Sequence, residues 1–308
     1  MHYTLHQLNI FNKICETKSI TKAAEILHLT QPAVSIQLKN FQDQFEIPLT
    51  EIIGRQLYVT AFGLEIAEAG KRILEEVHSI KHKAMAHKGK LSGELKIAVV
   101  STGKYVMPYF LSSFLEQHEG IDLNMDVTNR FEVIRSLEKN EVDFALVSVL
   151  PDNLQIESIE LMENKLFLVG GRKRAEKLIS ESNINLPENL PFIFRELGSA
   201  TRQAMERFLE TEKIQPSKLM QLTSNEAVKQ AVVARLGLSV MPIIGIKNEL
   251  RSSEIKIIPV KGLPIITSWN LIWLKGKKFA PAASEYLKYL EQDKAEIIQE
   301  EFSWMKGY

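Results

Sequence analysis

From residue 95 onward, short apolar segments typical of strands alternate with longer amphipathic segments typical of helices. This alternation predicts an α/β fold, with parallel sheets that carry helices on both faces. The expected strands cover residues 95–100, 123–127, 143–149, 165–169, 192–195, 219–223, 239–241, 255–260 and 269–274. Helices are expected at 105–117 and 131–139, in the later gaps between strands, and after Pro281.

This C-terminal region, 91–308, is large for a single sheet, so two subdomains are expected. The first would comprise 93–161 and 268–301, and the second 162–267. Two such halves leave a cleft at the carboxyl ends of their strands, where α/β proteins bind ligands.

Polar side chains follow several of the expected strands and would face this cleft. Hydroxyls, guanidinium groups and free helix N–H groups are suited to binding phosphate or carboxylate. The predicted ligand-contacting residues are Ser101, Thr102, Asn129, Arg130, Arg195, Ser199, Thr201 and Arg202. Plain helix capping is the alternative for the first pair, and a solvated loop is the alternative for the run at 195–202.

The chain lacks the marks of several protein classes. Its apolar runs are far shorter than the roughly 20 residues of a membrane span, and its first residues lack a secretory pattern. We therefore expect a cytoplasmic protein that does not contact a membrane. The single cysteine, Cys15, lies among apolar helical positions and is interpreted as a core residue. Without a phosphate loop, a catalytic triad pattern or a metal-ligand pattern, no enzyme activity, cofactor or metal is expected.

Two short helices are expected near the N-terminus, after a first amphipathic one. Apolar residues at helical spacing mark the first helix: Leu5, Leu8, Ile10, Phe11 and Ile14. Ser19 is a typical N-cap for the second, whose inward face carries Ala23, Ala24 and Leu27.

The third helix follows the break at His28 and is capped by Thr30 or Gln31. Pro32 is tolerated in its first turn. Its apolar face carries Val34, Leu38 and Phe41, and its polar face carries Gln31, Ser35, Gln37 and Lys39. With a strand at 57–59 and a turn at Gly54-Arg55, this arrangement predicts a winged helix-turn-helix at 1–61.

Charge does not distinguish DNA binding from a plain three-helix packing module. Five basic residues in the first 60 are balanced by five acidic residues.

A long helical pattern at 62–90 links the two regions. Its apolar positions recur at intervals of four and three residues, as in a short coiled coil: Ile66, Gly70, Ile73, Val77, Ile80 and Ala84. This spacing predicts a dimerising linker helix, and packing against its own domain is the alternative.

The N-terminal region resembles the LysR-type transcriptional regulators. The resemblance rests on Ser19-Ile20-Thr21-Lys22-Ala23-Ala24-Glu25, Leu29-Thr30-Gln31-Pro32-Ala33-Val34-Ser35, Gly54-Arg55 and Thr60-Ala61-Phe62-Gly63. It implies binding of double-stranded DNA through Ser19, Thr21, Thr30, Gln31, Pro32, Ala33, Ser35, Gln37, Lys39 and, on the wing, Arg55. Leu49-Thr50-Glu51-Ile52 departs from the family's usual Leu-Phe-x-Arg.

The C-terminal region resembles one branch of this family, the regulators of the RuBisCO operon. The segments that carry the resemblance include Asn129-Arg130, the run at 195–202, the run at 224–232 and Gly262-Leu263-Pro264. It implies a two-subdomain domain like that of periplasmic binding proteins, a small anionic metabolite as effector, and a homodimer or homotetramer. Ala200 stands where the branch has glycine, and Arg235 occupies another usual glycine position. A regulator of an unrelated operon and a solute-binding protein remain alternatives.

Overall fold

The computed structural model describes residues 3–54, 56–86, 89–180 and 190–308. The chain divides into two compact units, Met1–Lys90 and Leu91–Tyr308.

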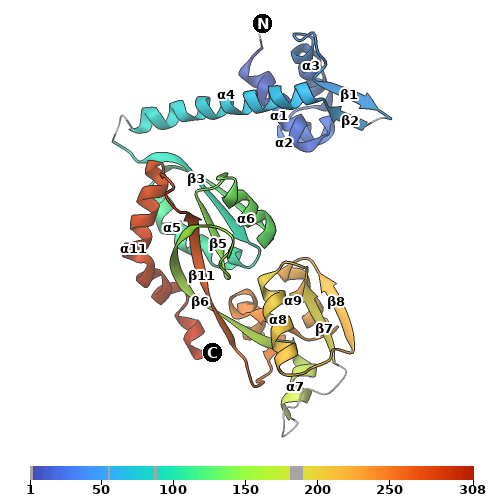
Figure 1. Cartoon of the computed structure of the whole chain (residues 1–308), viewed down its shortest axis with the longest axis vertical. Coiled ribbons are helices and arrows are strands. Elements are labelled where there is room, and N and C mark those ends of the chain that lie inside the picture. Colours follow the sequence, from blue (N-terminus) through green and yellow to red (C-terminus); the bar gives the residue numbers. More distant parts are fainter. Residues whose placement is uncertain (1–2, 55, 87–88, 181–189) are drawn as a thin grey trace. The chain divides into compact units, whose positions relative to one another are not determined.

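The N-terminal unit is a helical module with a small β-hairpin (Figure 1). Its elements are α1 (Leu5–Thr17), α2 (Ile20–Ile26), α3 (Gln31–Gln42), β1 (Thr50–Ile53), β2 (Gln56–Val59) and α4 (Ala61–Ala86). Side-chain caps start the first three helices: Thr4, Ser19 and Thr30 each accept a hydrogen bond from a first-turn backbone N–H. The predicted cap at Ser19 is therefore confirmed, and Thr30 caps α3.

The core of this unit consists of the apolar faces expected from helical spacing. Ile10, Phe11 and Ile14 of α1 are fully buried against Val34 and Phe41 of α3 and their neighbours. The strand β1 was not predicted. It pairs antiparallel with β2, with Ile53 opposite Gln56. Thr50 donates from its backbone N–H and its hydroxyl to Gln42 Oε1 at 3.0 and 2.7 Å.

The helix α4 spans the predicted linker, but its apolar seam is divided between two roles. Gly70 is buried, and a Cβ built on it would lie 3.2 Å from Leu8 Cδ2 of α1. Ile66 packs against the same core. Ile73, Val77 and Ile80 are 40%, 38% and 61% exposed. The expectation of one continuous dimer seam was wrong for the first two positions, because Ile66 packs against the core of its own unit and α1 covers Gly70.

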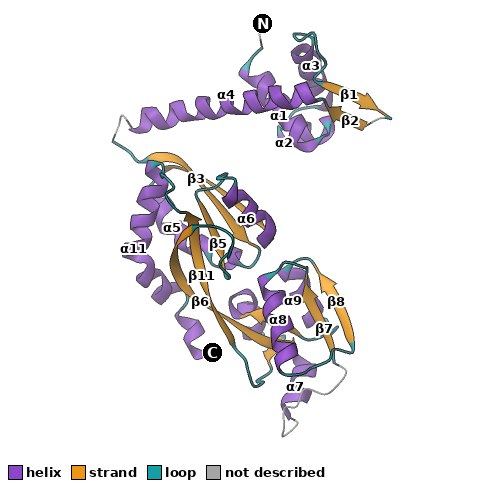
Figure 2. Ribbon diagram, viewed as in Figure 1, coloured by secondary structure: helices purple, strands orange, loops and turns teal. Residues whose placement is uncertain are grey.

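The C-terminal unit is an α/β domain (Figures 1 and 2). Its strands are β3 (Ser92–Val100), β4 (Gly120–Thr128), β5 (Phe144–Val147), β6 (Ile156–Gly171), β7 (Pro191–Arg195), β8 (Lys218–Leu222), β9 (Ser239–Pro242), β10 (Ile255–Ile257) and β11 (Ile265–Leu274). Its helices are η1 (Gly103–Tyr105), α5 (Met107–Gln117), α6 (Arg130–Glu138), α7 (Arg172–Ser180), α8 (Ala200–Thr211), α9 (Asn225–Val233), η2 (Ile243–Ile246), α10 (Lys247–Arg251), α11 (Pro281–Glu301) and η3 (Ser303–Gly307).

The main sheet is mixed, which corrects the prediction of parallel sheets. Its order is β10-β6-β11-β5-β3-β4, and β9 also pairs with β6. β3, β4 and β5 are parallel, whereas β6, β9, β10 and β11 join by antiparallel pairs. The chain leaves the first lobe along β6 and returns along β11 in the opposite direction, so these two strands pair antiparallel.

The strands β6 and β11 are longer than predicted and run from one lobe to the other as a paired ribbon (Figure 2). The first lobe places α5 and α11 on the β3–β5 part of the sheet, with Phe110, Phe114 and Tyr286 buried in its core. The second lobe adds β7 and β8, with a core around Phe192 and Leu238. The lobe boundary thus lies within continuous strands rather than in loops.

Candidate functional site

The solvent-exposed face of α3 is the candidate DNA interface. Val34, Leu38 and Phe41 are 0%, 7% and 0% exposed and fix which face points inward. On the opposite face Pro32, Ile36 and Asn40 follow one another at intervals of four residues, and all three are exposed. Ser35 and Gln37, which were predicted to lie in the polar face, are half-buried on its flanks.

The other predicted DNA-contacting residues occupy several surroundings. Thr21, Gln31 and Lys39 are exposed, and Ala33 is half-buried. The hydroxyls of Ser19 and Thr30 accept from Lys22 N and Ala33 N at 3.3 and 3.4 Å, so both serve as helix caps.

The predicted wing contact, Arg55, lies outside the described residues. Its neighbour Gly54 has a φ of +56°, the left-handed conformation that glycine adopts readily in a tight hairpin turn.

In the C-terminal unit, the strand ends meet between the lobes as predicted. A narrow cavity is lined by Val100, Ser101, Thr102, Asn129, Arg130, Val147, Ser148, Arg195, Glu196, Ser199, Ala200 and Thr201. Every predicted cleft residue except Arg202 is in this lining. The cavity volume is about 20 Å³, which is room for about one water molecule.

Arg195 lies buried at the end of β7 and joins the two lobes. Its Nε and Nη2 donate to the two carboxylate oxygens of Glu196, each at 2.8 Å. Its Nη2 also donates to Ser101 Oγ of the first lobe at 2.7 Å. This bidentate pair neutralises the charge of Arg195.

Arg202 points away from the narrow cavity. Its guanidinium bonds Glu206 Oε1 at 2.7 Å, the Arg195 carbonyl at 2.9 Å and Gln221 Oε1 at 2.7 Å. It also lies 5.5 Å from the ring centre of Phe194. Arg202 therefore fastens α8 to β7 and β8. Two of the three arginines predicted for the cleft, Arg195 and Arg202, thus have carboxylate partners.

Arg130 is the predicted cation for which the structure gives no ion pair among the described residues. Its Nε is buried without a hydrogen-bond partner, and its Nη2 donates to the Leu150 carbonyl at 3.4 Å. It is the first residue of α6, where the helix dipole disfavours a cation. Asn129 Oδ1 caps the same helix by accepting from Glu132 N at 3.0 Å. An anion beside Arg130 would relieve this unfavourable placement.

Ser199 and Thr201 lie at the start of α8, and each residue is 8% exposed. Ser199 occupies the N-cap position without making a side-chain cap bond. A hydroxyl that does not cap its own helix is available to a ligand oxygen, as are the first backbone N–H groups of α8.

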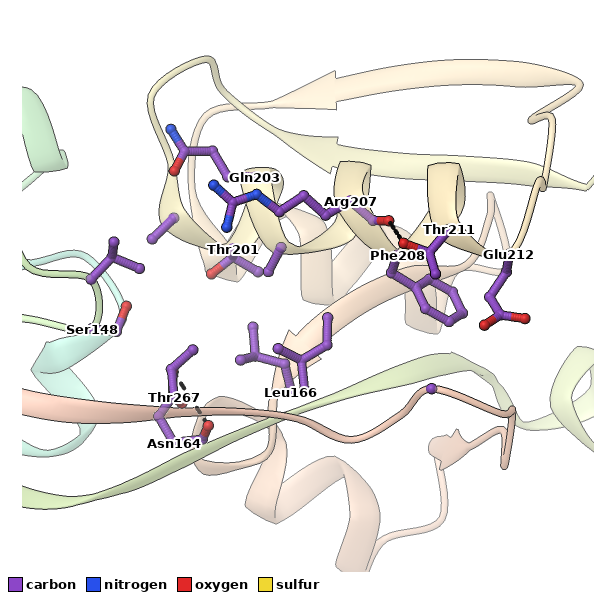
Figure 3. A pocket seen from close by; sticks show the side chains of 15 residues that line it. Ser148, Asn164, Leu166, Thr201, Gln203, Arg207, Phe208, Thr211, Glu212 and Thr267 are labelled. Carbon is purple, nitrogen blue, oxygen red and sulfur yellow. Dashed lines mark hydrogen bonds between the residues drawn. The ribbon is translucent and has the colours of Figure 1, made fainter.

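A wider cavity of about 280 Å³ shares Ser148, Ala200 and Thr201 with the narrow one. Figure 3 shows Arg207 of α8 on one side, and Asn164 of β6 and Thr267 of β11 on the other. Asn164 is 3% exposed; its Nδ2 donates to Thr267 Oγ1 at 3.0 Å, and its Oδ1 is buried without a partner. The wide cavity thus combines apolar walls with one unsatisfied acceptor.

Sequence reasoning missed Ile36, Ser148, Asn164 and Arg207. Ser148 follows β5, so the rule that selected Ser101 and Asn129 also applies to it. The spacing of Arg202 and Glu206, four residues apart on a helix, was a signal that Arg202 has a partner. Asn164 was missed because the predicted strand began at residue 165, whereas β6 begins at Ile156 and includes Asn164.

A second set of contacts joins the lobes. Tyr105 of η1 donates to Glu226 Oε2 of α9 at 2.7 Å, and Lys229 Nζ lies 2.6 Å from Glu226 and 2.9 Å from Glu249. Burial opposes both charges, but hydrogen bonds from Lys229 and Tyr105 hold the pKa of Glu226 below its ordinary value. The ion pairs likewise raise the pKa of Lys229, although burial alone would lower it.

Other chemistry has little support in the part of the chain that the structure describes. No group of His, Cys, Asp and Glu there could hold a metal ion. Burial raises the pKa of the Cys15 thiol to about 12, which makes it a poor nucleophile. Among the same residues, no helix has both the length and the apolar character to cross a membrane.

Known proteins resemble both units. The family model described as the LysR substrate binding domain matches residues 88–295. The model described as bacterial regulatory helix-turn-helix protein, lysR family, matches residues 5–64.

Two relatives match over nearly the full length. A RuBisCO operon transcriptional regulator of Allochromatium vinosum is 36% identical, covering 96% of this chain and 98% of the relative. The transcriptional activator CmpR of Synechocystis is 35% identical, covering 93% and 94%.

Solved structures of transcriptional regulators share the fold of this chain. The CcmR regulatory domain of Synechocystis, in complex with 2-PG, has a TM-score of 0.60 and 30% identity, covering 65% of this chain and 96% of that one. Full-length CbnR, solved with its target DNA, shares the fold with a TM-score of 0.71 and 18% identity, covering 94% and 99%. As the sequence predicted, the relatives are transcriptional regulators and not enzymes, and this chain belongs to the LysR family of bacterial helix-turn-helix transcriptional regulators.

Proposed function

We propose that this regulator binds duplex DNA through the exposed face of α3, and that an organic anion bound between the lobes changes this binding. It would act in the cytoplasm, as a dimer or a dimer of dimers, on an operon for carbon assimilation. The name of the Allochromatium vinosum relative and the 2-PG bound to the CcmR domain support this assignment.

The observation that carries the ligand proposal is the polar lining between the lobes. Arg130 supplies an unpaired cation with a buried, unused Nε. Ser199, Thr201 and the start of α8 supply hydroxyl and N–H donors. The anionic group is therefore assigned to the narrow cavity, between Arg130 and α8.

The narrow cavity must widen to hold a phosphate or a carboxylate, since its volume is only about 20 Å³. The Arg195–Ser101 hydrogen bond crosses this space between the lobes. An anion would therefore shift the lobes relative to one another, and the organic part of the ligand would extend into the wide cavity. Differential affinity for two lobe arrangements is what lets a ligand act as an effector.

Calorimetric titration of the full chain tests this assignment. The panel comprises 2-PG, phosphoenolpyruvate, phosphorylated sugars, nicotinamide dinucleotide phosphate, inorganic phosphate and simple carboxylates. At least one anion should bind, and Arg130→Gln should weaken it about tenfold or more, as expected when a charged hydrogen bond is removed.

Arg202→Gln is the matched control, since Arg202 is absent from the lining of the narrow cavity. It should retain most of the affinity. Binding that survives Arg130→Gln unchanged, or a panel in which no anion binds, would overturn the cleft assignment.

A further inference from the structure

The outermost ridge of α3 carries an isoleucine where a polar residue would be expected on a solvent-facing helix surface. Ile36 is 58% exposed, and its ridge neighbours Pro32 and Asn40 are exposed too. The core faces of α3, through Val34 and Leu38, point to the opposite side. Ile36 therefore lies at the centre of the exposed face of α3, opposite the core.

The major groove of DNA offers one apolar group on its base edges, the C5-methyl of thymine. Hydrogen-bond donors and acceptors of the other bases gain nothing from an isoleucine, and their desolvation against it has a cost. An exposed isoleucine at the centre of a groove-facing helix thus favours an A·T pair at the contacted position.

We propose that Ile36 determines sequence specificity by contacting a thymine methyl group in each half-site. The inference rests on the proposed role of α3 as the groove-reading helix and goes beyond it by naming the base. The flanking Ser35 and Gln37, which are half-buried, contribute less to this position. Loss of one buried methyl contact corresponds to about fourfold in affinity.

Uracil substitution tests the proposal directly, because uracil differs from thymine only in lacking the methyl group. The full-length protein first selects duplexes from a randomised library, and a selected duplex serves as the probe. Each thymine is then replaced by uracil in turn. At one position per half-site, the wild-type protein should bind the uracil duplex about fourfold more weakly. Ile36→Ala should bind the thymine and uracil duplexes equally.

Ile47→Ala is the matched control, since Ile47 is 55% exposed but lies beyond the end of α3. It should keep the discrimination between thymine and uracil. Because Ile36 is exposed, its replacement should leave the thermal unfolding midpoint unchanged, so that a loss of discrimination is not a loss of fold.

Two outcomes would overturn the proposal. Either no uracil position weakens the wild-type protein, or Ile36→Ala retains the wild-type discrimination. A failure of the proposed role of α3 as the groove-reading helix would give a different result. If α3 did not read the groove, Asn40→Ala and Gln37→Ala would also select the same sequences as the wild-type protein.

Discussion

At Arg195, a buried guanidinium meets a carboxylate and a hydroxyl from opposite lobes. Arg195 is 4% exposed, so the stability of the fold depends on the partner that balances its charge. Removing one member of a buried ion pair leaves the other charge without compensation, which costs more than the pair itself contributes.

Glu196→Gln should therefore lower the free energy of unfolding by about 1–3 kcal/mol, because one charged hydrogen bond to Arg195 is lost. Urea denaturation of the full chain, followed by circular dichroism, measures this change. Glu285→Gln breaks an exposed pair with Lys288 and should leave the unfolding free energy unchanged within error. Equal effects of the two substitutions would mean that Arg195 does not depend on Glu196.

The ion pair of Glu226 should make a pH-dependent contribution to the free energy of unfolding. The pKa of Glu226 in the folded chain lies below its ordinary value of 4.5. Its stabilising effect is thus fully present above pH 4.5 and is lost as the pH falls through the lower, folded-state pKa. Solvent screens this partly exposed carboxylate, so Glu226→Gln should cost only about 1 kcal/mol at pH 7.

The difference between the Glu226→Gln variant and the wild-type chain should shrink as the pH is lowered below 4.5. Denaturation curves at pH 7 and at acid pH measure it. A difference that stays constant over this range would show that Glu226 makes no charge-dependent contribution.

At the scale of elements, α4 divides its apolar positions between its own unit and an open surface. Ile66 packs against the N-terminal core and Gly70 lies under α1, whereas Ile73, Val77 and Ile80 are exposed. Spacing of three and four residues predicts an apolar stripe, but it does not show which neighbour covers each part.

We propose that the exposed isoleucines of α4 pair with the same face of a second chain, so the double variant Ile73→Glu, Ile80→Glu should dissociate the dimer. Each isoleucine buried between two helices contributes about 1.5–3 kcal/mol, and the added carboxylates repel. Sedimentation velocity measures the pairing, and DNA affinity should fall with it. Leu64→Glu, at another exposed position of α4, serves as the comparison. An unchanged sedimentation coefficient in the double variant would refute this dimer surface.

The sequence predicted those elements whose periodicity is long enough to recognise. The apolar faces of α1 and α3 agree with the structure except at Leu5, which is 46% exposed, because a repeating apolar stripe marks them. β1 escaped prediction, because four residues with mostly exposed side chains show no alternation. Seven of the eight residues predicted for the cleft line the narrow cavity. They were found by one topological rule, that the carboxyl ends of strands meet at the same edge of a sheet.

Sequence reasoning assigned Arg130, Arg195 and Arg202 to the cleft without settling which carboxylates pair with them. Their different roles follow from their partners. Arg195 pairs with Glu196, the next residue, and Arg202 pairs with Glu206, one helical turn further on, whereas Arg130 has no carboxylate partner among the described residues. Electrostatic roles therefore depend on the folded arrangement and not on residue type alone.

At the scale of the whole molecule, we propose that the cleft between the lobes and the DNA-reading helix α3 are energetically coupled. Such coupling is reciprocal: an anion that changes DNA affinity by some factor must have its own affinity changed by DNA by the same factor. In the C-terminal unit, β6 and β11 connect two lobes that also meet through Arg195–Ser101, Tyr105–Glu226 and a shared apolar core. A shift between these lobes is the rearrangement that we propose for the coupling.

The most direct test measures DNA affinity by fluorescence anisotropy, with a library-selected duplex and the full-length protein. Titrations are done without and with a saturating amount of the anion that binds most tightly in the calorimetric panel. The anion should change the dissociation constant for DNA by about fivefold or more, the lower end of typical allosteric coupling. Arg130→Gln should abolish the change, and Arg202→Gln should retain it. Identical DNA affinities with and without every anion that binds would show that the cleft and the DNA-binding helix are not coupled.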